Sequence, residues 1–347
     1  MTREQVVSRT LGYCTLLALL ATHATAAGQP AGASRESAPQ TQATTGISAP
    51  AKTSAPLVVI GFQPDAALDP RDAWTATAVE ETLAWRLGRV PALTVPPTVR
   101  THQARRELAE GDEDPPAEWA RVVRLLGAKH WLKGTCTGRP GALNLELELI
   151  AVDVPDAEPV TVELGPARLF DVIDDATRWT LGQLDVPRIS VATAELVFAP
   201  PAASPGAVEY YAKAVSAAQA GKLRDVPYYL ERALDYDRAF CPALLLLAKI
   251  ELRGTALPAA ATHLRRVKLL AADRGDAVSE SEFERSQGLL LMMTRSFEPA
   301  RKRFESALAI AFACNDTYGQ LAAMNGLCDY WCNRQPPAQA GLPTEAQ

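Results

Sequence analysis

The chain has 347 residues, of which 48% are hydrophobic, and a formal net charge of −5 at pH 7. This length permits two or three domains with substantial cores. The charge is mildly acidic and no basic tail or stripe is present, which argues against nucleic acid as a partner. Five cysteines follow residue 26, an odd number at irregular spacing that does not indicate a disulfide framework. Buried free thiols are the favoured interpretation of these cysteines.

The first residues have the pattern of a secretory leader. Arg3 and Arg9 flank a short polar start, a mostly apolar segment follows, and Ala24-Thr25-Ala26 offers a cleavage site between small residues. We expect a signal peptide at 1–26 and a periplasmic or secreted mature chain without a membrane span. An uncleaved inner-membrane anchor is the alternative. Residues 27–55, rich in Ala, Ser, Thr, Gln, Gly and Pro, are expected to form a disordered linker.

Residues 56–186 alternate strand and helix patterns. The apolar segment Leu57–Phe62 predicts a buried strand, and Trp74–Leu87 predicts a helix. His130–Thr137 and Ala142–Asp153 predict a hairpin, in whose second arm four alternating leucines should share one face. Further strands are expected at Leu93–Val95 and Val160–Leu164, and further helices at Val99–Glu110, Ala117–Leu126 and Ala167–Leu184.

This region resembles the amino-terminal α/β domain of TolB-like periplasmic proteins. The resemblance rests on Val58-Val-Ile-Gly-Phe62, Leu126-Gly-Ala-Lys-His-Trp-Leu-Lys-Gly134 and Leu145-Glu-Leu-Glu-Leu-Ile-Ala-Val-Asp153. In relatives these segments are an opening strand, a Gly-x-x-Tyr-x-x-x-Gly entry into a hairpin, and a strand ending in Leu-x-Asp. Here Trp131 replaces the tyrosine and Val152 the leucine. The resemblance implies a domain for protein contacts and extracytoplasmic assembly, without shared catalytic residues.

Residues 206–333 repeat one helical pattern. Small or compact residues recur at Ala214, Ala248, Gly288 and Cys328, at intervals of 34, 40 and 40. After each of the first three, further compact or bulky apolar residues follow at 12, 16 and 19 positions, a spacing that suits two closely packed antiparallel helices. These residues are Val226, Leu230 and Ala233; Ala260, Leu264 and Val267; and Ala300, Phe304 and Ala307. Asp225, Thr255 and Ser296 are predicted to cap the second helices.

A period of about 34 residues built from helix–turn–helix units is typical of tetratricopeptide (TPR) repeats, which 206–333 therefore resemble. The expected fold class is α+β and multi-domain. It comprises a small TolB-N-like α/β domain at 56–186, a connector at 187–205 and an all-α TPR-like superhelix of about three and a half repeats at 206–333. A disordered tail is expected at 334–347. An irregular helical bundle with alanine-rich interfaces is the alternative.

In TPR arrays the first helices line a concave groove. The partner-binding positions expected on that groove are Tyr211, Lys249, Arg285, Met292 and Asn325, and Trp331 of the last helix is a further expected partner-binding position. An extended or helical protein segment suits this mixture better than a terminal carboxylate does.

The last helix, Thr317–Asn333, carries more large apolar side chains than can pack inward, namely Leu321, Met324, Leu327, Tyr330 and Trp331. We therefore expect this end to be covered by another copy or a partner, or the array to be a shortened version of a longer one.

No motif indicates catalysis, a cofactor or a metal. Gly134-Thr-Cys-Thr-Gly138 imitates a nucleophile elbow, but a second strand is expected after it where the elbow needs a helix. None of the histidines after the leader has a second ligand nearby in sequence. The acidic clusters at Glu110–Asp114 and at Asp171, Asp174 and Asp175 are interpreted as solvated surface. The histidines are His102, His130 and His263.

The sequence thus favours a non-enzymatic exported scaffold that acts through protein–protein contacts at the cell envelope. An extracytoplasmic sensory module that binds a small ligand or responds to an envelope signal is the second hypothesis. An enzyme that uses Cys136 or an acidic pair is the third.

Overall fold

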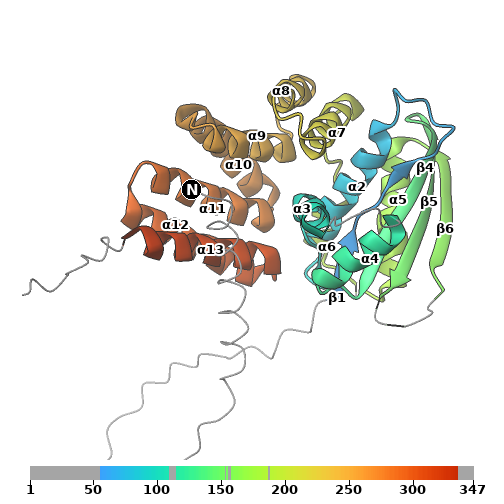
Figure 1. The fold of residues 1–347 in the computed structure, drawn as a ribbon, viewed down its shortest axis with the longest axis horizontal. Coiled ribbons are helices and arrows are strands. Elements are labelled where there is room, and N and C mark those ends of the chain that lie inside the picture. Colours follow the sequence, from blue (N-terminus) through green and yellow to red (C-terminus); the bar gives the residue numbers. More distant parts are fainter. Residues whose placement is uncertain (1–54, 109–114, 153, 155–157, 187, 335–347) are drawn as a thin grey trace, which may run out of the picture. The chain divides into compact units, whose positions relative to one another are not determined.

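The computed structural model describes residues 55–334 except 109–114, 153, 155–157 and 187 (Figure 1). In this part of the chain it shows an α+β fold with one mixed sheet and twelve helices. The expected leader, the tail and the acidic segment Glu110–Asp114 lie outside the described residues, as does nearly all of the expected linker.

The sheet has the strand order β3-β1-β4-β5-β6, with β2 beside β4. Strand β1 runs parallel to β3 and β4, whereas β5 is antiparallel to both β4 and β6. The predicted hairpin is confirmed, since Arg139 pairs with Ala142 across its turn. The strands are β1 (Ala55–Val59), β2 (Gln63–Pro64), β3 (Leu93–Thr94), β4 (His130–Arg139), β5 (Ala142–Ala151) and β6 (Val160–Ala167).

Both faces of the sheet are covered, because alternate side chains of β1 enter two different cores. Leu57 and Val59 face α2 (Trp74–Leu87) and α5 (Leu169–Gln183), and Val58 and Ile60 face α4 (Pro115–Leu125). Helix α3 (Thr98–Leu108) contributes Ala104 to the second core. A strand buried on both faces needs a continuous apolar run, which this sequence provides. The predicted shared face of β5 is confirmed by the burial of Leu143, Leu145, Leu147 and Leu149.

The expected connector at 187–205 is not a plain linker. Residues Val191–Phe198 form helix α6, whose N-cap is Ser190: its hydroxyl accepts a hydrogen bond from the backbone N–H of Thr193 at 3.1 Å. Val197 is fully buried and anchors this helix. The sequence, with prolines on both sides of this short segment, indicated a connector but not this helix.

Seven helices follow and pack as consecutive antiparallel pairs, α7 with α8, α9 with α10 and α11 with α12, before α13 (Figure 1). We call α7 to α13 the helical array. Its helices are α7 (Pro205–Gln219), α8 (Val226–Tyr236), α9 (Cys241–Arg253), α10 (Leu257–Arg274), α11 (Ala277–Met293), α12 (Phe297–Ala313) and α13 (Thr317–Arg334).

The positions that repeat in the sequence occupy buried positions in successive pairs. Ala214, Ala248 and Gly288 are buried in α7, α9 and α11. The bulky positions of the second helices, Leu230, Leu264 and Phe304, are 0% exposed. A Cβ built on Gly288 would lie only 2.5 Å from the Phe304 ring. Position 288 requires glycine because Phe304, which faces it, is larger than the leucines at the equivalent positions 230 and 264.

Two of the three predicted caps lie at the N-cap position. These are Asp225 of α8 and Ser296 of α12, although their side chains make no cap hydrogen bond. The prediction for Thr255 is wrong, because the N-cap of α10 is the next residue, Ala256. Thr255 instead has φ 63° and ends α9: its N–H donates to the carbonyl of Leu252, and the next N–H to that of Glu251. This Schellman geometry recurs at Gly221, Gly275, Arg295 and Asn315.

Replacing Thr255 with glycine is expected to stabilise the fold by about 1 kcal/mol, because a β-branched residue is strained in the left-handed region. The reverse change in a matching turn, Gly275→Ala, should cost a similar amount, about 1 kcal/mol. Chemical denaturation of both variants measures this. A loss of stability in Thr255→Gly would contradict the assigned turn geometry.

Candidate interaction surfaces

The six positions predicted to bind a partner fall into three groups. Tyr211 is engaged inside the molecule: its hydroxyl donates to Glu81 of α2 at 3.3 Å, and its ring packs edge-on against Phe240 with centroids 5.3 Å apart. Lys249 and Arg285 meet at one carboxylate, and Met292, Asn325 and Trp331 lie apart from them on α11 and α13. The structure thus brings only two of the six together.

Lys249 of α9 and Arg285 of α11 both pair with Glu282. The Lys249 Nζ lies 2.9 Å from Glu282 Oε1, and the Arg285 Nε donates to Glu282 Oε2 at 3.0 Å. Burial by itself would raise the pKa of Glu282, but the charges of Lys249 and Arg285 outweigh it and hold this pKa at about 2. The side chains of Lys249, Glu282 and Arg285 are 39%, 22% and 18% exposed. This cluster is a charged, partly accessible feature on adjacent first helices.

The remaining three positions are more open. Met292 is half-buried, and Asn325 and Trp331 are exposed on α13. Trp331 keeps 54% of its surface exposed although its ring packs edge-on against Tyr330. Tyr330 itself is fully buried, and its hydroxyl donates to Glu298 at 2.7 Å.

Helix α2 contacts the helical array along its length, which the sequence did not reveal. The hydroxyls of Thr77 and of Ser216 in α7 lie 3.1 Å apart. At the other end of α2, Arg89 donates to Asp276 at the start of α11 at 2.7 Å, and both side chains are almost fully buried. Beyond it, the Asn315 side chain donates to the carbonyl of Pro91 at 2.7 Å. Apolar residues of the sheet region and of the array accordingly belong to one continuous core.

A pair of adjacent carboxylates lies on α2. Glu80 accepts hydrogen bonds from the N–H groups of Gly61 and Phe62 at 2.9 and 3.1 Å, and it contacts His102 Nε2 at 2.8 Å. The pKa of Glu81 is raised to about 7, because burial penalises its charge more than the hydrogen bonds from Thr98 and Tyr211 favour it. Glu81 is therefore a carboxyl that titrates near neutral pH within the contact between α2 and α7.

Glu81→Gln is expected to stabilise the protein at pH 8 and to have little effect at pH 4.5. A folded-state pKa raised from 4.5 to about 7 means that Glu81 favours folding below pH 4.5 and that this benefit is lost as the pH rises through 7. The gain at pH 8 should be roughly 1–3 kcal/mol, measured by chemical denaturation.

The exposed Glu231, changed to Gln, is the matched control for this pH dependence. Equal effects of the Glu81 change at the two pH values would contradict a neutral carboxyl at Glu81.

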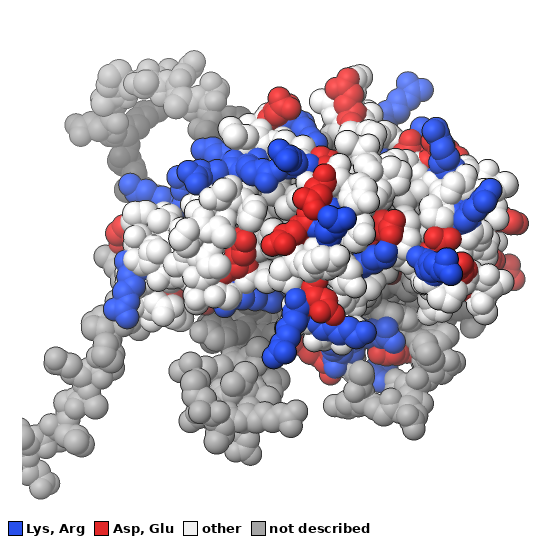
Figure 2. Space-filling model, turned by 90° about the horizontal axis from the view of Figure 1, so that it is seen from above, with Lys and Arg blue, Asp and Glu red and all other residues white. Residues whose placement is uncertain are grey.

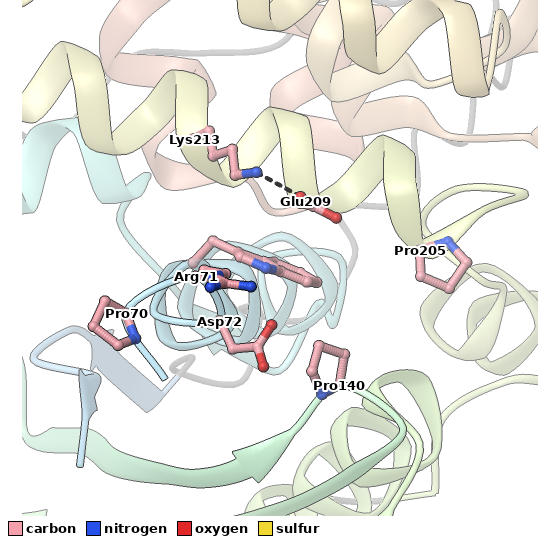
Figure 3. A pocket seen from close by; sticks show the side chains of 8 residues that line it. Pro70, Arg71, Asp72, Pro140, Pro205, Glu209 and Lys213 are labelled. Atoms are coloured by element: carbon pink, nitrogen blue, oxygen red, sulfur yellow. Dashed lines mark hydrogen bonds and ion pairs between the residues drawn. The ribbon is translucent and has the colours of Figure 1, made fainter. Parts of the chain in front are cut away.

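A cavity of about 570 Å³ opens between the start of α2, the β4–β5 turn and α7 (Figure 3). The Lys213 and Glu209 side chains of α7 form an ion pair at one side, and Arg71 and Asp72 lie on the facing segment. Pro70, Trp74, Pro140 and Pro205 complete the lining. Cavities of this size suit small molecules, roughly 300–1,000 Å³.

The residues that the sequence analysis considered for chemistry are buried or have structural partners. The expected burial of the cysteine thiols is confirmed for Cys136 and Cys241 and is wrong for Cys328 and Cys332, which are exposed on α13. Cys136 is fully buried within strand β4, and burial raises the pKa of its thiol to about 12. His263 contacts Glu251 at 2.8 Å, and Asp174 pairs with the buried Arg86. Among the described residues, no three His, Cys, Asp or Glu side chains come together in a group that could hold a metal ion.

The surface carries both signs of charge. Figure 2 shows acidic and basic side chains interspersed over much of the drawn face, together with one gathering of basic side chains. None of the helices in the described part of the chain combines the length and apolar character that crossing a bilayer requires.

Comparison with known proteins yields a partial structural likeness. No family model matches the sequence, and no curated protein does. Among solved structures, the chain is similar to the LpoB C-terminal domain from Salmonella enterica, at 20% identity and a TM-score of 0.26. The match covers 34% of this chain and 87% of that one.

Proposed function

We propose that this chain is an exported, non-enzymatic scaffold that mediates protein–protein contacts at the cell envelope. In this proposal the array is a TPR-like superhelix that presents a groove, and the sheet region is a TolB-N-like domain that contributes further contacts. The export in this proposal is inferred from the signal-peptide pattern of residues 1–26.

One observation carries the proposal: the small and the bulky repeat positions of three successive helix pairs are all buried. Ala214 with Leu230, Ala248 with Leu264, and Gly288 with Phe304 are all buried at corresponding positions. Arrays that repeat one helix pair expose an extended surface lined by equivalent residues, and such surfaces bind protein segments. The Lys249–Glu282–Arg285 cluster supplies charged groups on that surface. The buried Cys136, with a pKa of about 12, disfavours the thiol-enzyme hypothesis.

Site-specific photocrosslinking in the native envelope tests this function. A photoreactive phenylalanine analogue at Lys249 or Met292 should capture the same protein. The same analogue at Lys302, an exposed residue of the second helix α12, should capture none. Equal capture from all three positions, or none from any, would contradict partner binding through the groove.

The cavity beside α2 supports a second candidate, a sensory module that binds a small ligand. Its lining joins the sheet region to α7, so a ligand there would contact both. In a thermal-shift screen of small molecules, a ligand of this cavity should raise the melting temperature of the wild type and not that of Arg71→Ala. If no compound does so while the photocrosslinks form, the scaffold is favoured over the sensor.

A further inference from the structure

Helix α13 presents a partly exposed apolar stripe. Leu321, Met324 and Trp331 are 37%, 41% and 54% exposed, and Cys328 is exposed between them. Their spacing of i, i+3, i+7 and i+10 places all four on one side of the helix. The opposite side packs on α12, where Ala323 is fully buried and Gly326 abuts the Phe304 ring.

Helices α11 and α13 correspond residue by residue at an offset of 40. Each begins with an aspartate whose Oδ1 accepts an N–H three residues on: Asp276 from Ser279 at 3.1 Å, and Asp316 from Gly319 at 2.9 Å. The residue before each aspartate, Gly275 or Asn315, has a left-handed backbone. The two helices therefore start in the same way, and the offset can be applied along their length.

With this offset, the stripe occupies the positions by which α11 holds its second helix, α12. Leu321 corresponds to Ser281, whose hydroxyl donates to the carbonyl of Ala307 at 2.9 Å. Met324 corresponds to Glu284, which binds Arg303 at 2.8 Å. Cys328 corresponds to Gly288, which faces Phe304, and Trp331 to Leu291. The stripe on α13 thus lies where a packed helix would sit.

Two features of the stripe fit a second copy of the same helix. Residues 317–328 contain no charged side chain, so pairing with itself incurs no like-charge repulsion along that length. In an antiparallel pair centred level with residue 326, Leu321 faces Trp331 and Met324 faces Cys328 of the other helix. All four positions then pair within the set, as a two-fold interface requires.

We propose that α13 pairs antiparallel with α13 of a second copy, which takes the place that α12 occupies on α11. This pairing goes beyond the proposed function, because it uses the stripe of α13 and not the groove of first helices. Stable interfaces bury about 1,200–2,000 Å² in total, and an interface formed by one helix of each copy is small by comparison. The dimer should therefore be reversible and depend on concentration.

Sedimentation velocity of the full chain under reducing conditions, over a wide concentration range, tests the proposal. The wild type should shift from monomer to dimer, and Leu321→Glu and Trp331→Glu should remain monomeric with unchanged circular dichroism. Phe312→Glu is the matched control, since Phe312 is 61% exposed on α12 outside the stripe, and it should still dimerise. A wild type that stays monomeric, or stripe variants that still dimerise, would overturn the proposal.

The register has its own test. Met324→Cys should form a covalent dimer with Cys328 of the second copy on mild oxidation, and Phe312→Cys should not gain one. Equal crosslinking of both variants would contradict the antiparallel register. If the wild type is monomeric but a different protein is bound and lost in Trp331→Glu, the stripe belongs to that partner and self-pairing is wrong. Because Lys249 and Met292 lie outside the stripe, the photocrosslinking result for the groove is independent of this outcome.

Discussion

Phe304→Ala is expected to lower the free energy of unfolding by about 3–5 kcal/mol, the largest effect anticipated for a single side chain in the array. The Phe304 ring is fully buried, and it lies against both Gly288 of α11 and Gly326 of α13. Its removal would leave a cavity at the point where three helices meet. Chemical denaturation of the purified chain measures the loss.

A substitution at Gly288, the residue that faces Phe304, tests whether this packing belongs to the repeat. Gly288→Ala alone should cost about 1–3 kcal/mol, because its Cβ would lie 2.5 Å from the ring. Combined with Phe304→Leu, it recreates the Ala–Leu pair that α7–α8 has at 214 and 230, and α9–α10 at 248 and 264. The double variant should therefore recover most of the loss caused by Gly288→Ala.

Gly182→Ala provides the control, since a Cβ there meets nothing within 4 Å. It should be neutral or stabilising by about 1 kcal/mol. If the double variant is no more stable than Gly288→Ala alone, the three helix pairs do not share one packing arrangement.

Arg89→Met is expected to destabilise the protein by about 3–5 kcal/mol, because it leaves the carboxylate of Asp276 buried without its partner. The side chains of Arg89 and Asp276 are 5% and 3% exposed, and Arg89 also donates to Ser279 at 3.0 Å. Burial by itself would raise the pKa of Asp276, but the charge and hydrogen bonds of Arg89 hold it below its usual range. The pair therefore stabilises the folded state above about pH 4, and this stabilisation is lost as the pH falls through the lowered pKa of Asp276.

Thermal unfolding should also change in form. Arg89 and Asp276 join α2 to α11, so their loss is expected to split a single transition into two. Adding Asp276→Asn should restore part of the stability, since Asn keeps the side-chain oxygen that accepts from the Ser279 N–H. Arg168→Met removes an ion pair whose two side chains are 81% and 48% exposed, and it should have little effect on stability. A similar cost for the Arg89 and Arg168 variants would contradict the buried pair.

Much of the secondary structure could be predicted from periodicity. The helix Trp74–Leu87 has the predicted bounds, and the alternating leucines of β5 share the predicted face. The small and bulky positions of the three helix pairs are buried where their spacing placed them, whereas the fourth small position, Cys328, is exposed. These predictions succeeded because each depends on one element and its nearest neighbour along the chain.

The contacts of α2 could not be predicted, because they depend on which distant elements come together. Glu80 and Arg86 are polar residues of α2 and Arg89 follows its C-cap, Gly88. In a two-layer domain, such side chains would be exposed to solvent. Here α2 is enclosed by the sheet, α5 and α7, and these side chains are buried. For the same reason Tyr211, predicted to face a partner, donates to Glu81 instead. No spacing in the sequence signals that contact.

The cap predicted at Thr255 was wrong for a local reason. Thr255 has the composition of an N-cap, but it lies in a three-residue turn in which its N–H and the next N–H bond to carbonyls of the preceding helix. In turns this short, the residue beyond the first helix must adopt the left-handed conformation whatever its type. Composition favours a cap at such positions, and the length of the turn decides otherwise.

An experimental structure of the chain tests the central claim most directly, through superposition of the pairs α7–α8, α9–α10 and α11–α12. The account predicts that Ala214, Ala248 and Gly288 fall on one another, each opposite Leu230, Leu264 or Phe304. If these residues lie at different heights along their helices, or face different neighbours, the array is an irregular bundle and the shared groove does not exist.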